Sequence, residues 1–141
     1  MSMMDDAKPS ESVAPPAAAD RLGIAASTAC AIHCAIVATI PSLGALGLGA
    51  LMGHVAEWAF TIIAIGLAMV ALWQGWRHHR SPAVAAVFAL GVAALIGSRL
   101  AEEAGVGGVG GALGVTGAAA LVAAHLLNIR AYRRRRSTDA P

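Results

Sequence analysis

Four long runs without charged side chains constrain the fold of this chain more than any other feature. They cover residues 22–40, 58–76, 82–98 and 110–129. At a rise of 1.5 Å per residue, a helix over the first run would be about 28 Å long, which matches a hydrocarbon core of about 30 Å. Charged residues make up only 13% of the sequence, against about 25% in soluble domains. We therefore predict an all-α membrane protein, a bundle of four transmembrane helices.

Prolines and glycines mark the ends of these runs. Pro41 and the glycine-rich segment 42–53 follow the first run, and Pro82 opens the third at a position favoured in a first helical turn. Residues 1–19 are rich in Pro, Ser and Ala and lack a periodic apolar face, so we predict a disordered tail and no cleaved signal sequence. The membrane domain is predicted over residues 20–130, and residues 131–141 are predicted to be a basic tail.

Basic residues predict how the helices are oriented. With four spans, the N-terminus, the link at residues 77–81 and the C-terminal tail lie on one side of the membrane. That side holds nine of the ten basic residues: Lys8, Arg21, Arg77, Arg80, Arg130 and Arg133–Arg136. Only Arg99 lies on the other side. Because cytoplasmic segments carry the excess of Lys and Arg, both termini are predicted to be cytoplasmic.

The two cysteines of the chain, Cys30 and Cys34, lie in the middle of the first run. They are one helical turn apart, so a helix places both thiols on one face, and His33 lies within an arc of about 100° with them. Two thiols and an imidazole favour a thiophilic metal ion. We predict Cys30 and Cys34 as metal ligands and His33 as a weaker third ligand or a proton acceptor. The alternative is that the cysteines only pack, as buried free cysteines usually do.

Small residues extend the cysteine face along the same run. The stripe consists of Gly23, Ser27, Cys30, Cys34 and Ala38. Such a stripe lets another helix approach closely, which would place the sulfur atoms inside the bundle and away from lipid. Packing alone would also produce this pattern, and we favour packing as the role of Ser27.

Polar residues near the ends of the runs form two further groups. The outer group consists of His54, Glu57, Glu102 and Glu103. One interpretation is a vestibule that collects a cation, although Glu57 near a helix N-terminus is also favoured by the helix dipole. The inner group is His125 and Asn128, about one turn apart near the end of the fourth run. For these two we predict hydrogen bonds between helices.

Three other patterns favour structural roles. Residues 105–110 read G-x-G-x-x-G, but no strand precedes them, so we reject a dinucleotide site. The glycine pairs at 107/111 and 110/114, continued by Ala118, favour close helix packing. Arg133–Arg136 directly follow a transmembrane run, which favours contact with anionic lipid, and we predict no nucleic-acid binding. His78 and His79 lie in a short link without a partner nucleophile, so we predict that the protein is not an enzyme.

The motifs around these residues resemble one known family. Asp20-Arg21-x-Gly23, Ser27 and Cys30-Ala31-x-His33-Cys34 look like the first-helix signature of the MerC-type mercury-resistance proteins. The basic link at 77–80 and the segment 124–130, which reads AHLLNIR, are also similar to that family. The resemblance covers about residues 20–130. It is most specific where C-A-x-H-C in the first run combines with H-L-L-N in the fourth.

The resemblance implies a multi-pass protein of the bacterial inner membrane that moves Hg(II) from periplasm to cytoplasm. It assigns ion binding to Cys30 and Cys34, with Hg(II) as the transported ion and no permanently bound cofactor. The implied partners are the lipid bilayer and, for release of the ion, cytoplasmic low-molecular-weight thiols or mercuric reductase. The tail at residues 131–141 lacks the further cysteine pair that such transporters usually carry, which favours small thiols.

Two other functions use the same residues. One is a membrane module that senses metal or thiol redox state without translocation. The other is a structural membrane subunit in which Cys30 and Cys34 only pack. Of the three, we favour the transporter.

Overall fold

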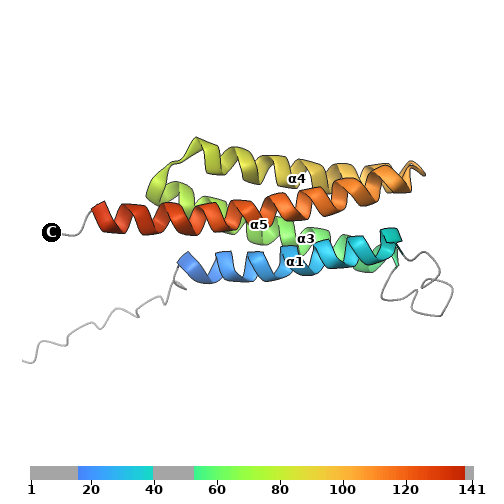
Figure 1. Ribbon diagram of the computed structural model, residues 1–141, viewed down its shortest axis with the longest axis horizontal. Helices are drawn as coiled ribbons and strands as arrows, with labels where there is room; N and C mark the ends of the chain where they lie inside the picture. Colours follow the sequence, from blue (N-terminus) through green and yellow to red (C-terminus); the bar gives the residue numbers. More distant parts are fainter. Residues whose placement is uncertain (1–15, 40–52, 139–141) are drawn as a thin grey trace, which may run out of the picture.

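The computed structural model describes residues 16–39 and 53–138, and in these residues the chain forms four α-helices. They are α1 (Pro16–Thr39), α3 (His54–His79), α4 (Pro82–Glu103) and α5 (Gly107–Thr138). All four run along the long axis of the molecule (Figure 1). The start of α1, the link between α3 and α4 and the end of α5 lie at one end, which we call the basic end. The opposite end, called the outer end below, holds the turn between α4 and α5.

Short links with identifiable caps reverse the chain. Arg80 ends α3 in the left-handed conformation, with φ 46°, and Pro82 then starts α4 where its missing N–H costs nothing. Between α4 and α5 the chain turns through Gly105, whose φ of 79° suits glycine. Val106 N–H donates to the carbonyl of Ala101 at 2.8 Å and closes this turn. The tight links make neighbouring helices antiparallel.

The glycine pattern of the fourth run serves helix packing, as predicted. Gly110, Gly111, Gly114 and Ala118 are buried, and α5 packs most extensively against α4 and α1. A Cβ at Gly117 would lie 3.0 Å from the Cβ of Ala94 and 3.0 Å from the backbone nitrogen of Leu95. The prediction was wrong for residue 107, because helix α5 already begins there and this glycine is exposed.

Most helices extend beyond the predicted runs. Residues 16–19, assigned to the disordered tail, belong to α1, and much of the basic tail continues α5 as far as Thr138. The helices are longer than the predicted runs because charged residues at helix ends interrupt an apolar run but are compatible with helical structure. The rest of the predicted N-terminal tail and the glycine-rich turn at 40–52 lie outside the described residues.

Three helices are long and apolar enough to cross a membrane: α3, α4 and residues 107–135 of α5. Helix α1, which holds the first predicted span, is not among them within the described residues. It carries Asp20 and Arg21 near its start, and the predicted end of its span, Ile40, lies outside the described part of the chain. The four-helix, all-α architecture is thus confirmed, whereas crossing of the membrane by α1 and the cytoplasmic side of the termini stay predictions.

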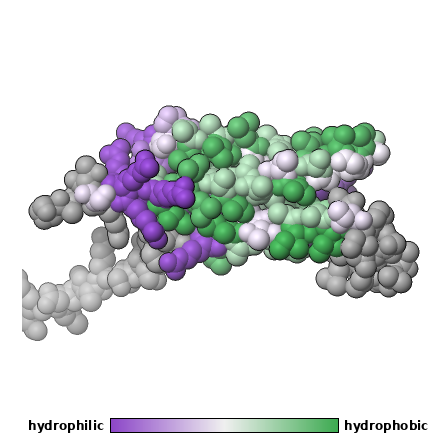
Figure 2. Space-filling model, viewed as in Figure 1, coloured by the Kyte–Doolittle hydropathy of each residue, from purple (hydrophilic) through white to green (hydrophobic). Residues whose placement is uncertain are grey.

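The surface matches a protein embedded in lipid. Hydrophilic residues gather at the basic end, and apolar residues cover the rest of the visible face (Figure 2). Large apolar side chains such as Ile62, Met69 and Leu90 are more than half exposed. A soluble monomer rarely exposes so extended an apolar surface, so these side chains are suited to contact acyl chains.

Candidate functional site

Four members of the small-residue stripe of α1 are buried inside the bundle: Gly23, Ser27, Cys30 and Cys34. Cys30 and Cys34 are 2% and 6% exposed, and both are free thiols. On the facing helix α5, a Cβ at Gly114 would lie 3.0 Å from the sulfur of Cys34. This confirms that the sulfur atoms lie inside the bundle. Because Gly114 has no side chain, α5 can approach α1 closely at Cys34.

A cavity of about 530 Å³ connects Cys34 to the outer end of the molecule. Cys34 and His33 line it from α1, and His54, Glu57 and Trp58 from α3. Its remaining lining residues come from α4 and α5: Arg99, Glu102, Glu103, Gly107, Gly108 and Gly111. The cavity therefore contains all four members of the outer polar group predicted from the sequence. Two of its carboxylates contact the guanidinium group of Arg99, and the third, that of Glu103, lies 3.9 Å from Nε2 of His54. Carboxylates thus outnumber the guanidinium group in the cavity, which favours cations.

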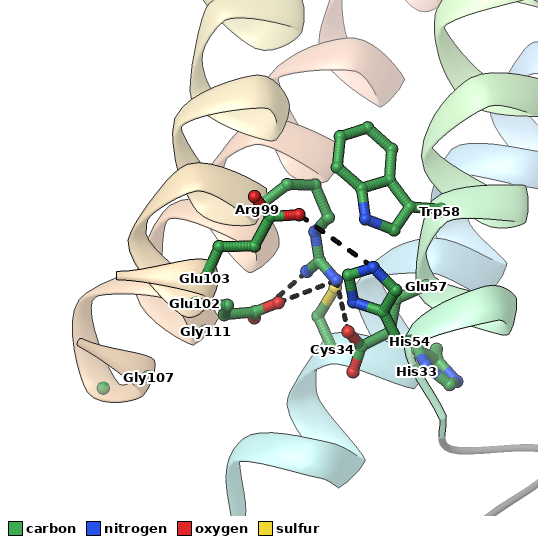
Figure 3. A pocket seen from close by; sticks show the side chains of 11 residues that line it. His33, Cys34, His54, Glu57, Trp58, Arg99, Glu102, Glu103, Gly107 and Gly111 are labelled. Atoms are coloured by element: carbon green, nitrogen blue, oxygen red, sulfur yellow. Dashed lines mark hydrogen bonds and ion pairs between the residues drawn. The ribbon is translucent and has the colours of Figure 1, made fainter. Parts of the chain in front are cut away.

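Arg99 occupies the centre of this cavity. Its Nη1 lies 2.8 Å from both Glu57 Oε2 and Glu102 Oε2, and its Nη2 donates to Glu102 Oε1 at 3.1 Å. Nη2 also donates to Ser98 Oγ, which donates to the carbonyl of Gly110 at 2.8 Å. Figure 3 shows the guanidinium group joined to the two carboxylates, in the cavity that Cys34 also lines. Arg99 is only 4% exposed, so these contacts are needed to stabilise its charge.

Sequence reasoning missed the role of Arg99. It counted this residue only as the single basic residue on the outer side. A signal was present, because a lone charge at the edge of a long uncharged run usually has a buried partner. Glu57 and Glu102 were assigned to a vestibule that collects a cation, and their ion pairs with Arg99 were not foreseen.

His33 lies at the edge of the cavity and apart from the sulfur of Cys34. Its ring packs on Phe60 at 5.1 Å between centroids, and it points away from Arg99 in Figure 3. Adjacent residues of a helix do not face each other, which explains the separation. Its Nε2 is buried without a hydrogen-bond partner in the part of the chain that the structure describes. The role of His33 as a weaker ligand stays a prediction.

A second polar cluster lies nearer the basic end, completely buried among α1, α3 and α5. Asp20, His125 and Asn128 are all 0% exposed. His125 Nδ1 lies 2.9 Å from Asp20 Oδ1, and Asn128 Nδ2 donates to both oxygens of the same carboxylate at 3.1 and 3.0 Å. His79 Nε2 lies 2.7 Å from Asn128 Oδ1. The predicted interhelical hydrogen bonds of His125 and Asn128 are confirmed, with Asp20 as the common acceptor.

Within residues 16–39 and 53–138, no group of three or more His, Cys, Asp or Glu side chains is arranged to hold a metal ion. A closed tetrahedral site is therefore not formed by these residues. What these residues present is a pair of free, buried thiols one helical turn apart, and their role as metal ligands stays a prediction.

Comparison with known proteins identifies the family. A family model described as MerC mercury resistance protein matches residues 20–130, which is most of the chain. The chain belongs to the MerC mercury resistance family. No curated protein and no solved structure gives a significant match. The match begins at Asp20 and ends two residues after Asn128, so this MerC chain carries the cysteine pair, the outer cavity and the buried inner cluster within its family domain.

Membership in the MerC family makes this a membrane protein of mercury resistance. The three long apolar helices agree with that assignment. Proteins of this family act in membrane transport, and the polar cavity leading to a buried thiol pair is compatible with that general activity.

Proposed function

We propose that this MerC protein carries Hg(II), or another thiophilic cation, from the periplasm to the cytoplasm by thiol exchange at Cys30 and Cys34. The observation that supports the proposal most directly is the position of Cys34 in the lining of an acidic cavity, with Cys30 one helical turn deeper. A cation attracted by the carboxylates would meet one thiol first and then the second. Both steps exchange ligands and do not change the oxidation state of the ion.

The two thiols differ in their access to water, which gives the exchange a direction. Cys34 lines the cavity, whereas Cys30 does not and is 2% exposed. Metal binding requires loss of the thiol protons, and the proton of Cys34 has a route to solvent through the cavity. We therefore assign capture of the ion to Cys34 and its retention inside the bundle to the pair.

Release of the ion completes the proposed cycle. Two thiolate ligands without a closed coordination shell hold an ion less permanently than a structural site, so an incoming thiol can compete. Cytoplasmic low-molecular-weight thiols or mercuric reductase would take the ion, and the bacterial inner membrane is the proposed location. In this cycle the protein performs no covalent chemistry on a substrate other than metal–ligand exchange and is not an enzyme.

Replacing either cysteine tests this function. Cells that express the protein without mercuric reductase should be hypersensitive to Hg(II), because they import the ion and cannot reduce it. Cys30→Ser and Cys34→Ser should each abolish the hypersensitivity and the uptake of labelled Hg(II) into vesicles. Ala29→Ser is the matched control, since it adds a hydroxyl to an exposed position of α1 and should leave uptake unchanged.

The outcomes separate the rival functions. Unchanged uptake in both cysteine variants would overturn the proposed mechanism. A metal-dependent change of thiol state without any uptake of labelled ion would instead favour a sensing module. Measuring Cu(I) and Zn(II) beside Hg(II) in the same vesicles identifies the transported ion.

A further inference from the structure

The buried cluster near the basic end contains a histidine nitrogen that the hydrogen-bond network leaves unused. The backbone N–H of Ser81 donates to His79 Nδ1 at 3.1 Å, so Nδ1 is an acceptor and the proton of this ring lies on Nε2. His79 Nε2–H then donates to Asn128 Oδ1, which fixes the orientation of the amide. The amide nitrogen of Asn128 consequently faces the carboxylate of Asp20, which also accepts a hydrogen bond from His125.

The hydrogen bond to Asp20 determines which nitrogen of the His125 ring carries the shared proton. The Asp20 carboxylate is an acceptor, so the ring proton of His125 lies on Nδ1 and points at Asp20 Oδ1. In the neutral ring with this tautomer, the other nitrogen, Nε2, has a lone pair available for a metal ion. It is completely buried and finds no hydrogen-bond partner among the residues that the structure describes. Phe88 packs edge-on against the ring at 4.9 Å and restricts its rotation.

Helix α1 faces this nitrogen with its smallest residue. A Cβ at Gly23 would overlap Cε1 and Nε2 of His125, so the glycine is what allows the ring to reach the stripe of α1. One turn further along the same stripe lies Ser27, which is 0% exposed and whose Oγ also has no hydrogen-bond partner within the described ranges. Two buried polar atoms without hydrogen-bond partners among the described residues, His125 Nε2 and Ser27 Oγ, thus lie between the cysteine pair and the basic end.

We propose that His125 Nε2 is a second, inner binding site for a thiophilic cation, with Ser27 Oγ as an accessory donor. Metal-binding histidines characteristically donate the other ring N–H to a carboxylate, which orients the imidazole and raises its basicity. His125 and Asp20 have this arrangement, and Asn128 and His79 hold the carboxylate in place. Imidazole binds borderline and soft metal ions less tightly than thiolate, which suits a site occupied in passing.

The inner site is separate from the cysteine pair. Gly23 and Cys30 are seven positions apart on α1, so His125 lies about 10 Å from Cys30 along the helix axis at 1.5 Å per residue. It therefore does not act as a third ligand of the pair. Its place on a transport route rests on the proposed function, whereas the existence of the site does not.

Binding of Hg(II) to protein without cysteines tests the site directly. The Cys30→Ala/Cys34→Ala protein, purified in detergent and labelled with ¹⁵N at histidine, is titrated with Hg(II). We expect the Nε2 resonance of His125 to shift while its Nδ1 resonance stays close to its starting position. His125→Asn in this background should abolish the corresponding binding step. Asp20→Asn, which is nearly isosteric, should weaken that step about 10–100-fold through loss of the orienting carboxylate.

The control is His78→Asn, because His78 is exposed and its ring nitrogen already lies 2.9 Å from the carbonyl of Gln74. This variant should bind Hg(II) as the cysteine-free parent does. The inner site is overturned if only His33, His54 or His78 resonances respond to Hg(II), or if binding survives His125→Asn unchanged. Neither result depends on Cys30 or Cys34, so failure of the inner site and failure of the proposed transport are distinguishable.

Discussion

At the scale of single residues, Arg99 makes the ion pairs that hold the outer cavity together. It neutralises part of the charge of two carboxylates that approach each other from α3 and α4. It lines the same cavity as Cys34, so under the proposed function a cation on its way to that thiol would compete with the guanidinium group for Glu57 and Glu102. The same residue thus joins α3 to α4 through its ion pairs and lies at the entrance proposed for the ion.

Removing the guanidinium group should destabilise the protein strongly. Arg99→Gln leaves Glu57 and Glu102 facing each other without a cation, and loss of one partner from a buried ion pair costs about 3–5 kcal/mol. Because both carboxylates are partly exposed, we expect the lower end of that range, measured as the free energy of unfolding in mixed micelles. Adding Glu57→Gln should recover part of the loss. A double variant less stable than Arg99→Gln alone would contradict this account.

The burial of Asp20 was also not predicted. The sequence offered Asp20 only as part of a family signature. The partners that bury it, His125 and Asn128, lie more than one hundred positions away in the chain. No local pattern in the sequence indicates hydrogen bonds between residues so far apart. They can be recognised only once the packing of α1 against α5 is known.

At the scale of helices, the close approach of α4 and α5 depends on glycines that face backbone atoms. Backbone cannot move aside as the end of a long side chain can. The predicted glycine pattern identified the correct face of α5, because small residues at intervals of four share one side of a helix. It did not identify the partner helix, which needed the packed structure.

Alanine at position 117 should separate the contributions of packing and helix propensity. Its Cβ would lie 3.0–3.1 Å from atoms of Ala94, Leu95 and Gly91, and overpacking of this kind typically costs about 1–3 kcal/mol. Gly66→Ala on α3 is the matched control, since no atom lies within 4 Å of its Cβ. We expect Gly117→Ala to lower the free energy of unfolding in micelles and Gly66→Ala to leave it unchanged or raise it slightly. Equal effects of the two substitutions would rule out the packing explanation.

At the scale of the whole molecule, polarity is distributed along the long axis. The basic end carries the described arginines of the α3–α4 link and of the final turns of α5, whereas carboxylates and one buried arginine line the cavity at the outer end. The long axis therefore joins an acidic opening to a basic end, with Cys34, Cys30, Ser27 and His125 in order between them.

The predicted orientation places the basic end in the cytoplasm, and fusions to the C-terminus test it. Green fluorescent protein attached after Pro141 should be fluorescent, and alkaline phosphatase at the same position should be inactive, because the latter folds only after export. Replacing the basic residues of the C-terminal tail by Gln should weaken this preference. An active phosphatase fusion on the unmodified protein would reverse the assigned direction of transport.

The sequence by itself determined the helical class, the three strongly apolar spans, the buried cysteine face and the family. The first three depend on patterns within one helix, where residues three or four positions apart share a side, and the family depends on motifs in the first and fourth runs together. Only the tertiary structure decided that Glu57, Arg99 and Glu102 close around the access to Cys34, and that Asp20 orients His125. Those contacts join different helices, and helix packing alone sets which faces meet.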